Sequence, residues 1–437
     1  MAFPSRKKSS RRVVESTKKV SGRTSSALKK SRSSPRTSTP RSLPGSPFLL
    51  ELGTEELPAL FIQPTIHLLG SLLEKTFDEN RLTYASIQTF GTPRRLVVMV
   101  NGLVTTQSSI SQEVLGPPQS FAYDAHGFPT KAAKGFASSQ GIAVESLQIR
   151  ETPKGTYVCA TKYESGRPTV EVLTEHLPKI IHQLSFKKSM TWNDSKLRFA
   201  RPLRWVVALF GKKTLRFEIG GVVSGSHTFG HRFLGTSPQK QKTGIKISDP
   251  ATYAATMKRH RVVVDPHERR SMIQAQVGQL AKSVKGTVYA LDHDELLELA
   301  VNTVECPQAV LGSFDSHFLQ LPQEVLITAM KEHQGYFSLI GKKGVLLPKF
   351  ITVTNMKLSN MDVIRLGNER VLTARLSDAQ YFFREDRTVT LEERVEQLRG
   401  ITFHQNLGSL RHKVMRLQEL APWIAEVVGC RDLKRAC

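Results

Sequence analysis

The sequence predicts a multidomain α+β protein with an α/β N-terminal domain, a mixed second domain and the start of a helical domain. A chain of 437 residues is long enough for two or three domains that each bury a core. Strand-like and helical patterns are mixed as far as Asn360, whereas helical patterns dominate from Met361 onward. Hydrophobic residues make up 39% of the chain, which suits a soluble protein. No apolar run approaches the roughly 18 residues of a membrane span.

Residues 1–47 form a basic segment that we expect to be disordered. They hold 13 of the 62 Lys and Arg residues but one of the 38 acidic residues, Glu15, and so carry +12 of the net charge of +24. They also contain 13 serines and five prolines but almost nothing large and apolar, so they cannot form a core. The segment fits an RNA-attracting arm, an organellar transit peptide or a linker.

Residues 48–240 are predicted to form the α/β domain. A short strand at Phe48–Leu52 precedes a helical pattern around Leu68–Phe77 and a strand-like run at Arg94–Val104. The turn in HGFP leads into a short helix at Lys131–Ser139. The remaining elements are a strand from Thr156, a helix at Val170–Leu184 and a buried strand in RWVVALFG from Arg204. The polar composition of Ser237–Gly244 indicates a domain joint.

Residues 241–400 are predicted to form the mixed domain. Its first two helices begin at Asp-Pro pairs, where Asp249 and Asp265 each offer an N-cap oxygen and the proline suits the first helical position. GKKGVLLP from Gly341 lacks the spacing of a phosphate-binding loop and is better explained as a hairpin turn. A strand is expected in LPKFITVTN, immediately after that turn.

The run GNERVLTARLSDAQYFFREDR, residues 367–387, is predicted to be an amphipathic helix. Its apolar side chains fall on one narrow face at 100° per residue: Leu372, Leu376, Ala379 and Phe383. Arg370, Ser377 and Tyr381 fall on the opposite face. Residues 401–437 are expected to begin a helical domain. Their apolar seam has a 3-4-3-4-3-4 spacing that requires a partner: Leu407, Leu410, Val414, Leu417, Ala421, Ile424 and Val428.

No catalytic constellation and no metal site is predicted. His227 and His231 are four residues apart, but flanking glycines argue against the helix that would bring them together. His293 and Asp294 form a single His-Asp step, which without further ligands is better explained as a solvated helix start. The cysteines are scattered without a C-x-x-C pair, as expected in a reducing cytosol: Cys159, Cys306, Cys430 and Cys437.

Clusters of basic and aromatic residues are the candidates for nucleic-acid binding. Guanidinium groups suit phosphate oxygens, and aromatic faces can stack on unpaired bases. The candidate RNA-binding residues are Arg94, Arg95, Arg201, Arg204, Arg232, Lys331, Arg370 and Tyr381. The alternative for each cluster is packing within the fold or at a subunit interface, because arginines beside Trp and Phe often make cation–π contacts.

Residues 367–387 closely resemble a motif of the β subunit of bacterial heterotetrameric glycyl-tRNA synthetase. Six further segments agree in the expected order: Phe48–Pro58, Phe90–Leu96, Arg198–Trp205, Gly230–Gly235, Met330–Phe337 and Leu407–Glu426. The resemblance spans residues 48 to about 430. The family's β subunit continues well beyond this point, so the resemblance implies the front part of a truncated or split β subunit. In fused α–β chains a linker joins the subunits, which favours the linker explanation for the tail.

The resemblance implies support of ATP-dependent attachment of glycine to tRNA(Gly) in the cytoplasm. The chain would bind tRNA and brace the catalytic α subunit in an α2β2 assembly, and the α subunit would bind ATP and Mg²⁺, so no cofactor is expected on this chain. The main alternative is a non-catalytic RNA-binding or assembly remnant of a split gene. An editing-type hydrolase is a third option, which rests on analogy of fold alone and has no nucleophile to support it.

Overall fold

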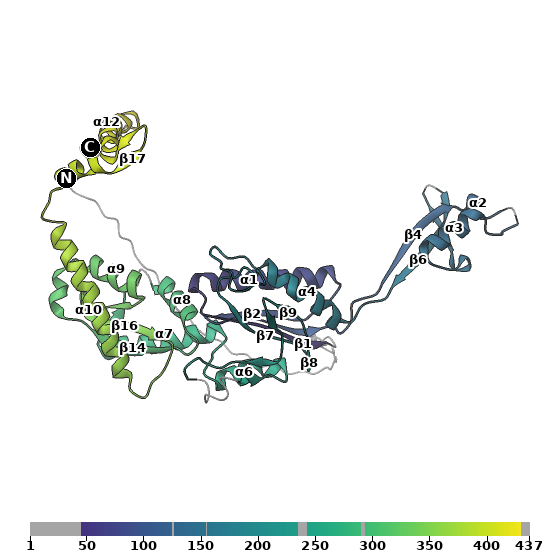
Figure 1. Ribbon diagram of the computed structural model, residues 1–437, viewed down its shortest axis with the longest axis horizontal. Coiled ribbons are helices and arrows are strands. Elements are labelled where there is room, and N and C mark those ends of the chain that lie inside the picture. Colours follow the sequence, from purple (N-terminus) through teal and green to yellow (C-terminus); the bar gives the residue numbers. More distant parts are fainter. Residues whose placement is uncertain (1–44, 125, 154, 235–242, 290–292, 430–437) are drawn as a thin grey trace, which may run out of the picture. The chain divides into compact units, whose positions relative to one another are not determined.

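The computed structural model describes residues 45–124, 126–153, 155–234, 243–289 and 293–429. It confirms the mixed α+β multidomain class, with several sheets and helices distributed along the chain (Figure 1). Most of the basic tail and most of the predicted joint at Ser237–Gly244 lie outside the described residues.

A five-stranded antiparallel sheet forms the centre of the N-terminal part, in the order β2-β3-β1-β7-β8. Its strands are β1 (Ser46–Thr54), β2 (Ser86–Thr92), β3 (Arg95–Leu103), β7 (Leu203–Phe210) and β8 (Lys213–Thr214). The strands predicted from Phe48, Arg94 and Arg204 are confirmed. The central strand β1 is buried from Phe48 to its end because both faces of the sheet are covered.

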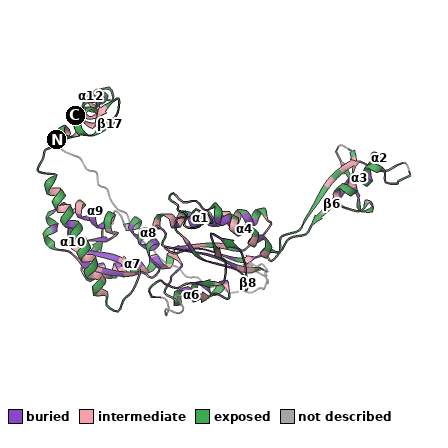
Figure 2. Cartoon of the chain, in the orientation of Figure 1, coloured by how far each residue is buried: buried purple, intermediate pink, exposed green. Residues whose placement is uncertain are grey.

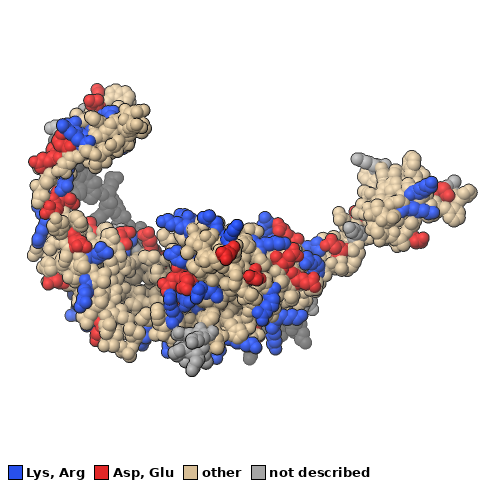
Figure 3. Space-filling model, in the orientation of Figure 1, with Lys and Arg blue, Asp and Glu red and all other residues tan. Residues whose placement is uncertain are grey.

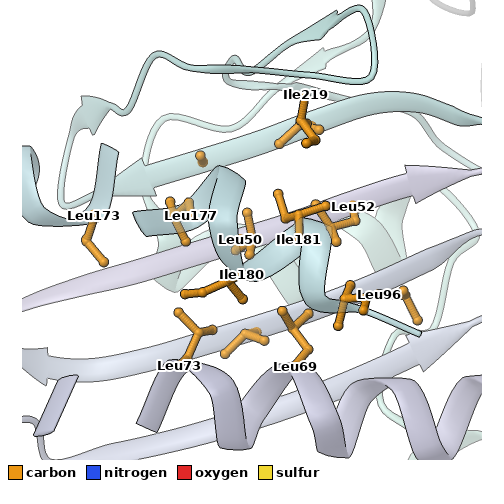
Figure 4. Close-up of a cluster of buried hydrophobic side chains, with 14 of the residues drawn as sticks. Leu50, Leu52, Leu69, Leu73, Leu96, Leu173, Leu177, Ile180, Ile181 and Ile219 are labelled. Carbon is orange, nitrogen blue, oxygen red and sulfur yellow. The ribbon is translucent and has the colours of Figure 1, made fainter. Parts of the chain in front are cut away.

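Helices α1 (Ala59–Glu79) and α4 (Thr169–Gln183) cover one face of this sheet. Figure 4 shows Leu69 and Leu73 of α1 and Ile181 of α4 packed against strand residues such as Leu50. Helix α6 (Tyr253–Arg259) packs on the other face. Both helices predicted in this part are confirmed. Short strands complete it: β9 (Glu218–Ile219), β10 (Val222–Val223), β11 (His227–Thr228) and β12 (Ile245–Lys246).

A second, smaller sheet lies between β3 and α4 in the sequence. It has the order β4-β6-β5, with strands β4 (Ile110–Pro118), β5 (Gln148–Thr152) and β6 (Gly155–Glu164). Helices α2 (Gln119–Ala122) and α3 (Lys131–Gln140) pack on it over a small core of its own. The predicted helix at 131–139 and the strand from Thr156 are confirmed. The sequence did not predict that they belong to a separate sheet-and-helix unit, because a core built largely of alanines leaves little hydrophobic pattern.

The next part contains a four-stranded antiparallel sheet in the order β13-β15-β16-β14. The strands are β13 (Thr287–Val288), β14 (Gln308–Ser313), β15 (Phe337–Ile340) and β16 (Leu346–Thr354). Helices α7 (Pro266–Ser283) and α8 (His293–Thr303) cover one face, and α9 (Gln323–Gln334) and α10 (Met361–Glu385) cover the other. Both predicted caps are confirmed, since Asp249 accepts the Ala251 N–H and Asp265 accepts the His267 N–H. The predicted hairpin joins β15 to β16.

Helix α10 confirms the predicted amphipathic run. Leu372 and Leu376 are fully buried, and Phe383 packs against the same core. The last described elements are α11 (Leu391–Gln397), β17 (Thr402–His404), β18 (Gly408–Ser409) and α12 (Leu410–Val427). The predicted seam is helical from Leu410, but in the described chain α12 buries only Ala425, and Figure 2 shows it mainly exposed.

Arg269 of α7 ties the first sheet to the second. Its guanidinium is fully buried and donates to the carbonyls of Gly91 (2.6 Å), Val301 (3.0 Å), Val263 (2.7 Å) and Val264 (3.0 Å). Burial lowers the pKa of Arg269 to about 10, so the side chain keeps its charge at neutral pH. One cation therefore donates to four buried backbone carbonyls.

Candidate nucleic-acid interface

Four segments that are far apart in the sequence meet where β1 ends and β3 and β7 begin. The last residue of β1 donates a backbone hydrogen bond to the turn before β3 (Thr54 N to Arg94 O, 2.9 Å), and the residue after β1 donates to the residue before β7 (Glu55 N to Pro202 O, 3.0 Å). The segment after β11 joins them, because Arg95 donates to two of its backbone carbonyls. Antiparallel pairing of β1 with both neighbours brings these loops to one edge of the sheet.

This edge carries a group of cations that we call the arginine cluster: Arg94, Arg201, Arg204 and Arg232. Arg204 Nε lies 3.4 Å from Glu55 Oε1, and Arg232 Nη1 lies 3.7 Å from one oxygen each of Glu55 and Glu56. Two of the four guanidinium groups thus lie beside carboxylates, and the four arginines with the two glutamates sum to a charge of 4 − 2 = +2. Outside the cluster, the face drawn in Figure 3 shows Lys and Arg interspersed with Asp and Glu over the sheet and its helices.

Arg94 is the least solvated member of the arginine cluster. Its guanidinium lies over the Trp205 ring, 5.5 Å from the centroid, and its Nε is buried without a hydrogen-bond partner in the described chain. Burial lowers the pKa of Arg94, and the neighbouring Arg95 lowers it further. A guanidinium nevertheless stays charged at neutral pH. A half-buried cation that forms no ion pair within the described chain is suited to an anion such as a phosphate.

Arg95 lies behind the cluster and is fully buried. Its guanidinium forms ion pairs with Glu51 of β1 (Nε to Oε1, 3.2 Å) and with Glu305, which follows α8 (Nη1 to Oε1, 2.5 Å). Thr92 Oγ1 also donates to Glu305 (2.7 Å), and the Arg95 guanidinium lies 5.3 Å from the Trp205 centroid. One arginine therefore joins the first sheet to the segment that leads into β14.

Arg95 was predicted to contact RNA, but in this structure its side chain is fully buried and cannot reach a ligand. Arg94 and Arg95 are adjacent, and neighbouring residues entering a strand point to opposite sides. The sequence motif alone could not tell which of the two faces inward. Glu51 was missed as a partner of Arg95. A single acid inside the apolar run FLLELG is a sequence signal for a buried carboxylate that pairs with a cation.

Glu51 is predicted to make the stability of the fold depend on pH. Burial raises its pKa, although the Arg95 charge and hydrogen bonds from Thr228 (2.7 Å) and Trp205 (3.1 Å) oppose that shift. Above the ordinary glutamate range the folded state then binds more protons than the unfolded state, so the free energy of unfolding falls as pH rises toward the folded-state pKa. Glu51→Gln should remove this slope.

Urea unfolding of wild type and Glu51→Gln between about pH 5 and pH 8 measures the effect. The other titrating groups are common to both proteins, so the difference between the curves isolates Glu51. We expect wild type to lose stability relative to the variant as pH rises. Parallel curves would show that Glu51 titrates alike in both states.

Comparison with known proteins shows the family to which the chain belongs. The family model described as the glycyl-tRNA synthetase beta subunit matches residues 48–437. The chain belongs to this family.

Curated relatives agree with this assignment. The glycine–tRNA ligase beta subunit of Geobacter sp. (strain M21) is 46% identical over 386 residues, covering 88% of this chain and 55% of the relative. Those of Syntrophus aciditrophicus and Desulforamulus reducens are each 42% identical, covering 86% and 89% of this chain. The chain spans about half the length of the curated relatives it matches. None of the helices that the structure describes is long and apolar enough to cross a membrane.

The other candidate residues of this beta-subunit chain lie away from the arginine cluster. Lys331 of α9 is largely buried and forms ion pairs with Glu295 (3.0 Å) and Glu332 (3.4 Å). Arg370 and Tyr381 are exposed on α10. They are eleven residues, about three turns, apart and so lie on the same side of that helix, as predicted. The structure therefore brings four of the eight candidates together and leaves these three on other elements.

Possible metal ligands are not grouped within the described residues, where no set of three or more His, Cys, Asp or Glu side chains could hold an ion. His227 lies in the short strand β11 and His231 in the loop after it, so their four-residue spacing is not helical. His231 instead accepts the backbone N–H groups of Phe233 and Leu234 at Nδ1. Its role in this structure is to hold the loop.

Proposed function

We propose that this chain is the N-terminal part of a glycine–tRNA ligase beta subunit that supports ATP-dependent glycylation of tRNA(Gly). It would hold the tRNA and brace a catalytic α subunit in an α2β2 assembly in the cytoplasm. The observation that carries the proposal is the convergence of three arginine-bearing segments on one edge of the first sheet, in a chain of this family.

The chemistry of the arginine cluster supports binding of a phosphate backbone. Arg204 and Arg232 are about half exposed, and their ion pairs with Glu55 and Glu56 are 3.4–3.7 Å long, so the carboxylates hold them loosely. Guanidinium groups form paired hydrogen bonds with phosphate oxygens more effectively than ammonium groups do. The buried Arg95 network fixes the loops from behind, so the cations are positioned before the ligand arrives.

The reaction itself would take place on the partner. The α subunit would bind ATP, glycine and Mg²⁺ and form the adenylate. The residues described here would bind and orient the tRNA rather than transfer a group.

Purified chain tests this division of labour directly. We expect no glycyl-adenylate, measured as glycine-dependent exchange of pyrophosphate into ATP, from the chain alone. We also expect it to co-elute with a glycine–tRNA ligase α subunit and to retain a tRNA(Gly) transcript. Adenylate formation without a partner would overturn the proposal, and binding of RNA without recovery of an α subunit would favour a non-catalytic RNA-binding remnant.

A further inference from the structure

Phe233, beside the arginine cluster, exposes most of an aromatic ring. Its side chain is 65% exposed, and the Arg232 guanidinium lies 5.7 Å from the ring centroid. Exposure alone does not single it out, because Phe121 of α2 and Phe128 of the loop after α2 are 70% and 67% exposed. Phe233 differs from them in how it is held and in what surrounds it.

The loop that carries Phe233 is anchored to the core. His231 is buried, and its Nδ1 accepts the backbone N–H groups of Phe233 (3.2 Å) and Leu234 (3.2 Å). The imidazole proton therefore lies on Nε2, which donates to Asn355 Oδ1 (3.2 Å). The same Asn355 oxygen accepts the N–H of Glu305 (2.7 Å). The exposed ring thus stands on a hydrogen-bonded support that reaches the Arg95 network.

The surroundings of Phe233 are cationic. Arg232 precedes it, and Arg94 interacts electrostatically with both Arg232 and Glu55. Arg94 forms no ion pair with any described residue and keeps a buried Nε without a partner. An aromatic ring beside guanidinium groups offers a surface for stacking and a site for an anion.

We propose that Phe233 stacks on an unpaired base of the bound RNA while Arg94 and Arg232 hold the adjacent phosphates. The inference rests on the proposed function and specifies the part of the RNA that this edge takes, a single-stranded segment. Bases inside an A-form duplex are stacked on their neighbours and cannot place a face on a side chain. An anchored loop backbone also loses little conformational freedom on binding, which favours Phe233 as a platform.

The test compares a short single-stranded RNA with a blunt-ended, two-stranded RNA duplex of the same strand length in fluorescence anisotropy, using the full chain. Stacking on one aromatic residue is worth about fivefold to about 150-fold in affinity. We expect Phe233→Leu to weaken single-strand binding by roughly tenfold and to leave duplex binding unchanged. Phe233→Tyr keeps an aromatic ring and should bind the single strand as wild type does. The matched control, Phe128→Leu, removes an equally exposed ring and should leave both affinities unchanged.

A second arm locates the segment in tRNA. Transcripts of tRNA(Gly) with and without the unpaired 3′ nucleotides separate the 3′ end from the loops as the source of the base. If the 3′ end supplies the base, Phe233→Leu weakens binding of the intact transcript and leaves binding of the trimmed one unchanged. If a loop supplies the base, Phe233→Leu weakens binding of both transcripts.

The inference is overturned if Phe233→Leu binds single strands as wild type does, or if Phe128→Leu causes an equal loss. In those cases removal of the cluster charges would still weaken RNA binding, and the proposed function would stand. If wild type retains no RNA of either kind, the inference and the proposed RNA-binding role fall together.

Discussion

Replacing Arg95 with methionine lowers the free energy of unfolding by about 3–5 kcal/mol, which is the largest stability effect we expect from a single substitution. The variant keeps most of the side-chain volume but leaves the carboxylates of Glu51 and Glu305 buried without their shared cation. It also removes the donors to the carbonyls of Phe229 and Gly230, so the loop after β11 loses its attachment. The midpoint of urea unfolding measures the loss.

Arg204→Met is the matched control for Arg95→Met. The Arg204 side chain is 59% exposed to solvent and forms an ion pair of 3.4 Å with Glu55. The free energy of unfolding should therefore fall by about 1 kcal/mol or less in this variant. Equal losses in the two variants would contradict a structural role for the buried network. A stable Arg95→Met protein that also binds tRNA like wild type would show that the loops assemble without that network.

Removing three exposed charges of the arginine cluster should weaken tRNA binding by at least roughly tenfold at physiological salt. In Arg201→Gln/Arg204→Gln/Arg232→Gln, three phosphate-binding groups are lost while Glu55 and Glu56 remain to repel the backbone. Filter binding of a tRNA(Gly) transcript measures the change.

The matched control removes three exposed cations from elements away from the cluster: Lys75, Lys179 and Lys213, each to glutamine. Both variants lose three positive charges and keep the basic N-terminal residues. A difference between their tRNA affinities therefore shows the effect of where the charges lie. Equal weakening in the two variants would mean that net charge, and not the converging loops, attracts the RNA.

Local pattern was sufficient to predict most elements of the fold. The strand at β1, the helix α4 and the amphipathic helix α10 follow from hydrophobic periodicity, which depends on residues a few positions apart. The capped start of α7 followed from the Asp265-Pro266 pair for the same reason. The separate β4-β6-β5 sheet was missed because an alanine-rich core carries a weak pattern.

The candidate site was predicted only in part, because its organisation is non-local. The chemistry of Arg94, Arg204 and Arg232 suggested phosphate binding, but nothing in their spacing showed that they share one edge of a sheet. The ion pair of Arg95 with Glu305 joins residues 210 positions apart, and the hydrogen bond of Arg269 to Gly91 joins residues 178 apart. Contacts of this range depend on strand order, which sequence periodicity does not specify.

The salt dependence of tRNA binding tests the central claim most directly, that the converging arginine loops grip a phosphate backbone. Each phosphate contact contributes about 0.7–0.9 to the slope of log K against log salt concentration. The arginine triple variant should therefore show a slope shallower than wild type by about two to three, with the lysine control unchanged. Parallel slopes for wild type and the arginine variant would contradict the account, because the cluster would then release no counterions when RNA binds.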